Sequence, residues 1–170
     1  IVYLINASKE SNIWANEYDR NWKDILSVQS EVAQTIAREL YTRITPEEKE
    51  RIEKKSTINL EAYDLYLLGR YFWNKRTKEG LTKSLDYFEK SIAQDPDYAL
   101  AYAGLADAYC ILAWWGWWPM SDGYAKAKEF ALQALKIDKN LAEAHATLGD
   151  LLIWSDWEWE EAEKELILAA

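Results

Sequence analysis

The sequence predicts a mainly α-helical protein: an α-α superhelix of three helix–turn–helix units, preceded by a β-hairpin and a long helix. The main observation is a pattern that returns at residues 65–72, 102–109 and 145–152, a period of roughly 40 residues. Repeats of this length are typical of solenoids, in which each unit covers the apolar face of its neighbour. Composition agrees, because 3 Pro and 6 Gly in 170 residues favour long regular elements.

Residues 1–18 are predicted to form the hairpin. Residues 1–5 are β-branched or aromatic, and residues 13–18 alternate between apolar and polar side chains as a half-buried strand does. The polar stretch between them is typical of a turn. A two-stranded hairpin is marginal in water, so we expect this one to lean on another element.

Residues 22–44 are predicted to form one long helix, because apolar side chains recur at steps of three and four. These are Ile25, Val28, Val32, Ile36, Leu40 and Ile44. Thr45 and Pro46 then mark a new helix start, with Glu48 completing a capping box. The segment 45–58 is highly charged, and we interpret it as a linker or a short exposed helix.

From residue 59 the chain is predicted to be helix, turn, helix three times, in units 59–96, 97–139 and 140–170. Asn59 is suited to cap the first helix. Asp95-Pro96 ends the first unit, and Asp138 stands at the same boundary of the second. Small residues recur at matching positions, which allows helices to approach closely.

The three units resemble the tetratricopeptide repeat, a 34-residue helix–turn–helix motif. The first unit matches at Leu65, Leu68, Gly69, Phe72, Ser84, Phe88, Ser91 and Pro96. The second matches at Tyr102, Leu105, Tyr109, Ala127 and Ala134, and the third at His145, Leu148, Gly149, Leu152, Ala162, Leu166 and Ala169. The second unit departs from the motif at Ala106, Ala131 and Lys139. The internal turns also hold extra residues, about three, nine and one by this alignment.

The resemblance implies that the first helix of each repeat lines a concave partner-binding groove. The residues that match these positions are Tyr66, Arg70, Trp73, Asp107, Cys110, Asp150 and Trp154. The resemblance also implies that Leu68 is a core residue. We therefore expect a non-catalytic scaffold that binds a protein or peptide partner. The alternative is a structural role, in which some of these side chains pack against the N-terminal helix.

The N-terminal residues 13–20 and 24–33 resemble the end of a TolB-like α/β domain. That domain precedes tetratricopeptide repeats in some microbial cyclases and winged-helix regulators. The resemblance implies that residues 1–44 are the last hairpin and helix of such a domain, and that the array is the regulatory arm of a larger signalling or transcription-regulating protein. No cyclase, kinase or DNA-binding segment is visible in the chain.

Charge is unevenly distributed. Residues 1–94 hold 15 acidic and 15 basic side chains, whereas residues 95–170 hold 14 acidic and 5 basic ones and carry the whole net charge of −9. An acidic surface repels phosphate backbones and anionic membranes, so we expect neither nucleic acid nor membrane as a partner. Two interpretations remain: a solvated face that keeps the array soluble, or a surface for a basic partner.

Four tryptophans cluster in the internal turn predicted for the second repeat: Trp114, Trp115, Trp117 and Trp118. Their rings could fill the seam between neighbouring repeats. Alternatively they form a patch for a partner or for self-association, since aromatic side chains with a polar edge favour interfaces.

The sequence offers no catalytic constellation, and we expect neither an enzyme, nor a cofactor, nor a metal site. Its one histidine, His145, occupies a packing position of the repeat, and no second histidine or cysteine exists to build a zinc site. The carboxylates at 156–163 fit the start of a helix better than a calcium loop. A hydrolase using them is the least favoured interpretation.

The main alternative function is a small-molecule sensor with an aromatic pocket between the N-terminal helix and repeat one. The single cysteine favours a reducing compartment, so we expect a cytoplasmic protein. The chain lacks an initiating Met, opens on a strand and ends within a helix that a further helix would cover. We therefore expect a fragment whose copies self-associate through these ends.

Overall fold

The computed structural model describes residues 2–6, 11–17, 25–39, 45 and 57–170. The chain divides into two compact units, residues 1–58 and residues 59–170. The expected helix start after Thr45 and the ends of the long N-terminal helix lie outside the described residues. None of the described helices is both long enough and apolar enough to span a membrane.

The first unit contains the predicted hairpin and helix. Strands β1 (Val2–Asn6) and β2 (Ser11–Asn16) pair antiparallel, and helix α1 runs over Ile25–Glu39. Leu4 faces Trp14 whereas Ile5 faces Asn12, so one residue of β2 bulges out of the ladder.

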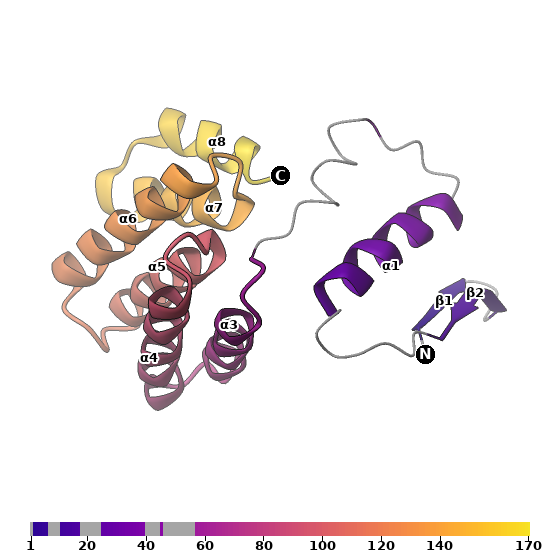
Figure 1. Ribbon diagram of the computed structural model, residues 1–170. Coiled ribbons are helices and arrows are strands. Elements are labelled where there is room, and N and C mark those ends of the chain that lie inside the picture. The colour runs from indigo at the N-terminus through magenta and orange to yellow at the C-terminus, as the bar shows by residue number, and fades with distance from the viewer. Residues whose placement is uncertain (1, 7–10, 18–24, 40–44, 46–56) are drawn as a thin grey trace. The chain divides into compact units, whose positions relative to one another are not determined.

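The second unit confirms the predicted superhelix of three helical pairs (Figure 1). The pairs are α3 (Leu60–Trp73) with α4 (Lys78–Gln94), α5 (Ala99–Trp114) with α6 (Met120–Ile137), and α7 (Ala142–Leu151) with α8 (Trp159–Leu168). The side chain of Asn59 accepts hydrogen bonds from the backbone N–H groups of Glu61 and Ala62, as its capping role predicts.

Each helix of the array packs on the next, and the first helices of the repeats also contact one another. Helix α5 contacts both α3 and α7 in addition to α4 and α6. The first helices therefore lie side by side in chain order. Their outward side chains share one surface, which is the arrangement that the candidate site needs.

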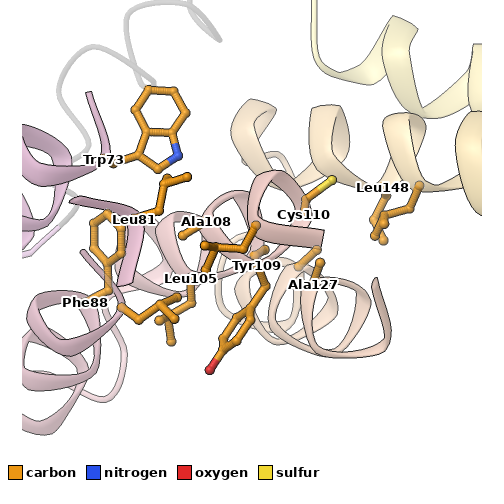
Figure 2. Close-up of a cluster of buried hydrophobic side chains, with 14 residues drawn as sticks. Trp73, Leu81, Phe88, Leu105, Ala108, Tyr109, Cys110, Ala127 and Leu148 are labelled. Carbon is orange, nitrogen blue, oxygen red and sulfur yellow. The ribbon is translucent and has the colours of Figure 1, made fainter. Parts of the chain in front are cut away.

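The core between the first two repeats forms around the ring of Phe88, which is fully buried (Figure 2). A Cβ atom added at Gly69 of α3 would lie 2.5 Å from this ring, and one added at Gly104 of α5 would lie 2.6 Å from it. Both glycines are therefore required by close approach. The hydroxyl of Ser91, also buried, donates a hydrogen bond of 2.7 Å to the backbone carbonyl of Ala62.

The departures of the second repeat from the motif compensate one another. In the first repeat Gly69 meets the large Phe88, and in the third Gly149 meets Leu166. In the second, the same two motif positions hold Ala106 and Ala131, and both are buried in the core cluster. The other repeats pair a glycine on one helix with a large side chain on the other. The second repeat has an alanine methyl group on each helix instead, so its helices can still pack closely.

The sequence predicts about nine extra residues in the internal turn of the second repeat. This prediction is wrong, because those residues do not form a long turn. They mostly lengthen the helices, because α5 continues to Trp114 and α6 begins at Met120. Only residues 115–119 connect the two helices. The break falls at Gly116, whose φ of 69° lies in the left-handed region that glycine adopts without strain. Trp114 therefore belongs to a helix rather than to the turn.

The extra residue of the third repeat coincides with a π-helical segment, η2 (Leu152–Asp156), that continues α7. A π turn holds one more residue than an α turn, so it takes up an insertion without ending the helix. Trp157 then adopts a left-handed conformation with φ of 57°, and the chain turns into α8. This segment positions Trp154 and Asp156.

The expectation that Leu68 is a core residue is wrong. Its side chain is 42% exposed, whereas the matching Leu105 of the second repeat is 1% exposed and Leu148 of the third is buried. Leu67 and Tyr71 are also exposed on α3. In the second and third repeats the matching face packs on the preceding repeat. The first repeat has no preceding repeat in its unit.

Candidate functional site

The candidate site is the surface that α3, α5 and α7 share, which we call the first-helix surface. Arg70, Asp107 and Asp150 occupy the same position of three successive repeats and define its central row. Because the three helices contact one another in order, this row crosses the array from the first repeat to the third. Its charge changes from positive to negative along that path.

The first two members of the row form an ion pair. Arg70 Nη1 lies 3.7 Å from Asp107 Oδ2, and about a third of each side chain is exposed. This separation exceeds that of a charge-assisted hydrogen bond, about 2.7–2.9 Å. The guanidinium therefore neutralises Asp107 only in part and leaves its oxygens able to accept from another donor.

Asp107 is an unusually basic carboxylate. Burial raises its pKa to about 6, the charges of Arg70 and Arg76 oppose that rise, and the charge of Asp150 adds to it. The pKa of Asp150 is also raised by burial, although its side chain reaches solvent. The charge of Asp150 therefore acts on Asp107, which burial solvates poorly.

Trp73 anchors the positive end of the surface. The guanidinium carbons of Arg70 and Arg76 lie 4.2 Å and 3.5 Å from the centre of its ring. The ring is 8% exposed and joins the core next to Leu81 (Figure 2). Its buried Nε1 has no acceptor among the described residues. Trp73 was expected in the groove on the strength of its motif position; its buried ring instead supports the two arginines from below.

Cys110 and Tyr66 also contribute more to packing than to an open surface. Cys110 is buried beside the carboxylates, and burial together with the charges of Asp107 and Asp150 raises the pKa of its thiol to about 12. Such a thiol remains protonated and is a poor nucleophile. The ring of Tyr66 packs edge-on against Tyr98 at 5.3 Å, and burial raises the pKa of its hydroxyl.

Trp154 extends the negative end of the first-helix surface. Its ring lies 4.9 Å from that of Trp114 at an angle of 60°, so the two repeats meet in an edge-to-face pair. Trp154 is 53% exposed and Trp114 is 48% exposed. Large aromatic rings in this state are typical of interfaces rather than of cores. We call these two residues the tryptophan pair.

The other tryptophans of the cluster divide between the two interpretations. Trp118 packs edge-on against Tyr109 at 5.5 Å and, like Trp117, is partly buried against the core. Trp115 is exposed and contacts Trp117 at 4.8 Å. The run therefore both fills the seam and leaves rings at the surface. Whether those rings bind a partner or a second copy of the chain stays a prediction.

His145 is a structural residue, as expected. It is buried, with Nδ1 2.6 Å from Glu165 Oε2 and Nε2 2.9 Å from the backbone carbonyl of Lys139. It thereby links α7 to α8. Among the described residues, no group of three or more His, Cys, Asp or Glu side chains could hold a metal ion. The carboxylates of Glu160 and Glu161 lie in the first turn of α8.

Two features of the site were not predicted from the sequence. Arg76 lies beyond the end of α3 in a left-handed conformation with φ of 50°, and this turn directs its guanidinium over Trp73. The contact between Trp114 and Trp154 depends on the π-helical segment η2. An arginine in a short turn carries no periodic signal. Left-handed backbone at a residue other than glycine, asparagine or aspartate is uncommon.

Comparisons with known proteins agree with the fold. The second TPR domain of Spaghetti (RPAP3), solved bound to the HSP90 peptide SRMEEVD, matches 67% of this chain and 94% of its own length, with a TM-score of 0.52 and 19% identity. This likeness shows a tetratricopeptide-like fold. No family model matches the chain.

Two relatives share sequence with the chain over longer proteins. A protein of Rhizobium meliloti (strain 1021) with the name "Putative adenylate cyclase 3" is 30% identical over 154 residues, which cover 89% of this chain. Transcriptional regulator HilA of Salmonella typhimurium is 28% identical over 102 residues, or 58% of this chain. The matched regions are 26% and 18% of those proteins. The TolB-like interpretation of residues 1–44 stays a prediction.

Proposed function

We propose that residues 59–170 bind an extended segment of a partner protein across the first-helix surface, and that the array is a regulatory arm of a larger protein. The observation that carries the proposal is the row of Arg70, Asp107 and Asp150, which three successive first helices present together. An extended peptide is long and narrow enough to contact all three residues of a row that crosses three repeats.

Two further observations support the proposal. Aromatic side chains accompany the row, with Trp73 under the arginines in the first repeat and the tryptophan pair supplied by the second and third repeats. Interfaces concentrate binding energy in Trp, Tyr and Arg side chains. The similar array of Spaghetti (RPAP3) was solved with a peptide, which makes a peptide partner reasonable here.

The regulatory part of the proposal rests on the relatives. One is named as a cyclase and the other as a transcriptional regulator, and the region similar to this chain is a minor part of each. An accessory arm that recruits or senses a partner fits both. The alternative, a small-molecule sensor between the N-terminal helix and repeat one, stays a prediction.

The test is a selection of binding peptides from a displayed random library on the 170-residue chain, followed by affinity measurements with variants. Arg70→Ala should weaken binding of the selected peptides by roughly 1–3 kcal/mol, as loss of an interface anchor does. Lys90→Ala is the matched control, because Lys90 also forms an ion pair but lies on α4, outside the first-helix surface.

Circular dichroism should show that both variants keep the helical content of the parent chain. Failure to select any saturable binder would contradict the proposal. So would selected peptides whose affinity falls equally in Arg70→Ala and Lys90→Ala, because binding would then not depend on the first-helix surface.

A further inference from the structure

The negative half of the first-helix surface has more carboxylate charge than its own basic residues neutralise. Asp107 has only the long 3.7 Å contact with Arg70 in its ion pair, and Asp150 has no ion pair within 4 Å among the described residues. The charge of Asp150 raises the pKa of Asp107, and the charges of both carboxylates raise the pKa of the Cys110 thiol. Because that thiol is protonated, it adds no charge of either sign.

The tryptophan pair lies further along the same helical segments as these carboxylates, with Trp114 on α5 after Asp107 and Trp154 in η2 after Asp150. Trp154 follows Asp150 by four residues, and the π-helical segment η2 continues α7 between them. The stem of a Lys or Arg side chain is apolar and packs well on aromatic faces while its charged end reaches a carboxylate. An exposed ring can therefore take the apolar stem of a basic side chain, and a carboxylate without a close ion pair can take its charged end.

We propose that the second and third repeats recognise a Lys or Arg side chain of the bound segment, holding its charge between Asp107 and Asp150 and its stem against Trp154. This inference rests on the proposed function and names the chemistry of the partner. The positive end of the row repels the same side chain, because Arg70 and Arg76 stack there on Trp73. The row therefore fixes where along the array the cation binds.

The proposal separates this array from its structural neighbour. The peptide bound to Spaghetti (RPAP3), SRMEEVD, carries three acidic residues and one basic residue. Like charges placed close together at an interface are unfavourable and serve to reject wrong partners. A segment of that composition would place its carboxylates against Asp107 and Asp150. A basic segment gains the attraction of the same two groups.

The experiment uses four pools of nonapeptides with blocked ends, in which the fifth residue is Arg, Lys, Glu or Leu and the other positions are mixtures. Each pool is passed over the immobilised 170-residue chain, and the retained fraction is measured at 0.15 M salt. We expect the Arg and Lys pools to be retained about tenfold more than the Glu pool, with the Leu pool between them.

A matched pair of double variants separates the site from the general negative field of the protein. Asp107→Asn with Asp150→Asn removes two charges from the row, and Asp122→Asn with Glu129→Gln removes two from exposed positions on α6. The first double variant should lose most of the preference for basic pools, and the second should keep it. In addition, Asp150→Arg should shift the preference towards the Glu pool.

Three results would overturn the inference. If both double variants lose the preference equally, the field of the whole chain attracts basic peptides and no site does so. If neither loses it, the cation binds elsewhere. If wild type retains all four pools equally, the proposed function stands and only the basic specificity is wrong. Retention of none of the pools above the bare matrix would instead contradict the proposed function itself.

Discussion

The first helix of the second repeat and the first helix of the first repeat carry the same motif in different surroundings. Helix α5 has neighbours on both sides and buries most of its residues, whereas α3 keeps Leu67, Leu68 and Tyr71 exposed. Helix α5 is apolar on all its faces, and a helix of that kind is stable when it is buried on every side. The comparison teaches that a repeat motif specifies a helix, while the neighbours decide which motif residues reach the core.

The largest expected difference between these helices is in the response to truncating the same motif leucine. Leu105→Ala should lower the free energy of unfolding by about 2–5 kcal/mol, because it opens a cavity at a position that is 1% exposed. Leu68→Ala should cost less than about 1 kcal/mol, since Leu68 is largely solvated. Urea unfolding followed by circular dichroism measures both. Equal losses would mean that Leu68 is covered in solution.

A second contrast concerns the glycines of the middle and last repeats. Gly104→Ala places a methyl group against the buried ring of Phe88 and should cost about 1–3 kcal/mol. Gly149→Ala meets Leu166, which is partly exposed and can change rotamer, so its cost should stay below about 1 kcal/mol. Thermal unfolding of the two variants tests this order. A Gly149 variant less stable than the Gly104 variant would contradict it.

Much of the fold could be predicted because repetition is visible in sequence. Three copies of a pattern, a capping Asn59 and an alternating N-terminal segment indicate the helical pairs and the hairpin. The extra residues could not be assigned in advance. Ala113 and Trp114 extend α5 because nothing before Gly116 stops the helix, and the inserted residue of the third repeat enters a π turn. Helix ends depend on local breakers and on packing together.

The candidate site was partly predictable for a related reason. Alignment of the repeats places Arg70, Asp107 and Asp150 at one position, and contact between α3, α5 and α7 brings that position into a row. The burial of Trp73 and Cys110 depends on neighbouring helices, which no single repeat describes. That the row binds a partner remains a prediction for all these residues.

The last helical pair differs from the middle one in being linked by a buried polar contact. Burial lowers the pKa of His145, but the hydrogen bonds with Glu165 and the Lys139 carbonyl, together with the Glu165 charge, raise it above its usual value. The contact therefore contributes most below about pH 6.5 and weakens as pH rises through the raised pKa. We expect His145→Gln to cost about 1–2 kcal/mol at pH 5.5 and less at pH 8.5.

Urea unfolding at both pH values measures that difference, with Lys164→Gln as a control. Lys164 also pairs with a carboxylate of α8, Glu161, but both of its groups are exposed. Its replacement should have a small and pH-independent effect. A cost of His145→Gln that grows with pH would mean that the neutral ring, and not the charged one, makes the stabilising contact.

The smallest expected effect concerns Asp107 of the middle repeat, whose carboxylate is poorly solvated because it is largely buried. Because burial raises the pKa of Asp107 to about 6, folding favours its protonated form. The folded state thus binds more protons than the unfolded state between about pH 4 and pH 6, so stability falls as pH rises through this window.

Asp107→Asn removes this penalty and should stabilise the protein by about 1 kcal/mol at pH 7. That value is reduced because part of the side chain is exposed to solvent. Below pH 4 the gain should vanish, because the native side chain is then neutral as well. Asp122→Asn, at an exposed position on α6, is the control and should change the stability little. If Asp107→Asn destabilises the protein at pH 7 but not below pH 4, the attraction between Arg70 and Asp107 outweighs the cost of burial. The row is then an internal brace of the array with little carboxylate charge to offer a partner.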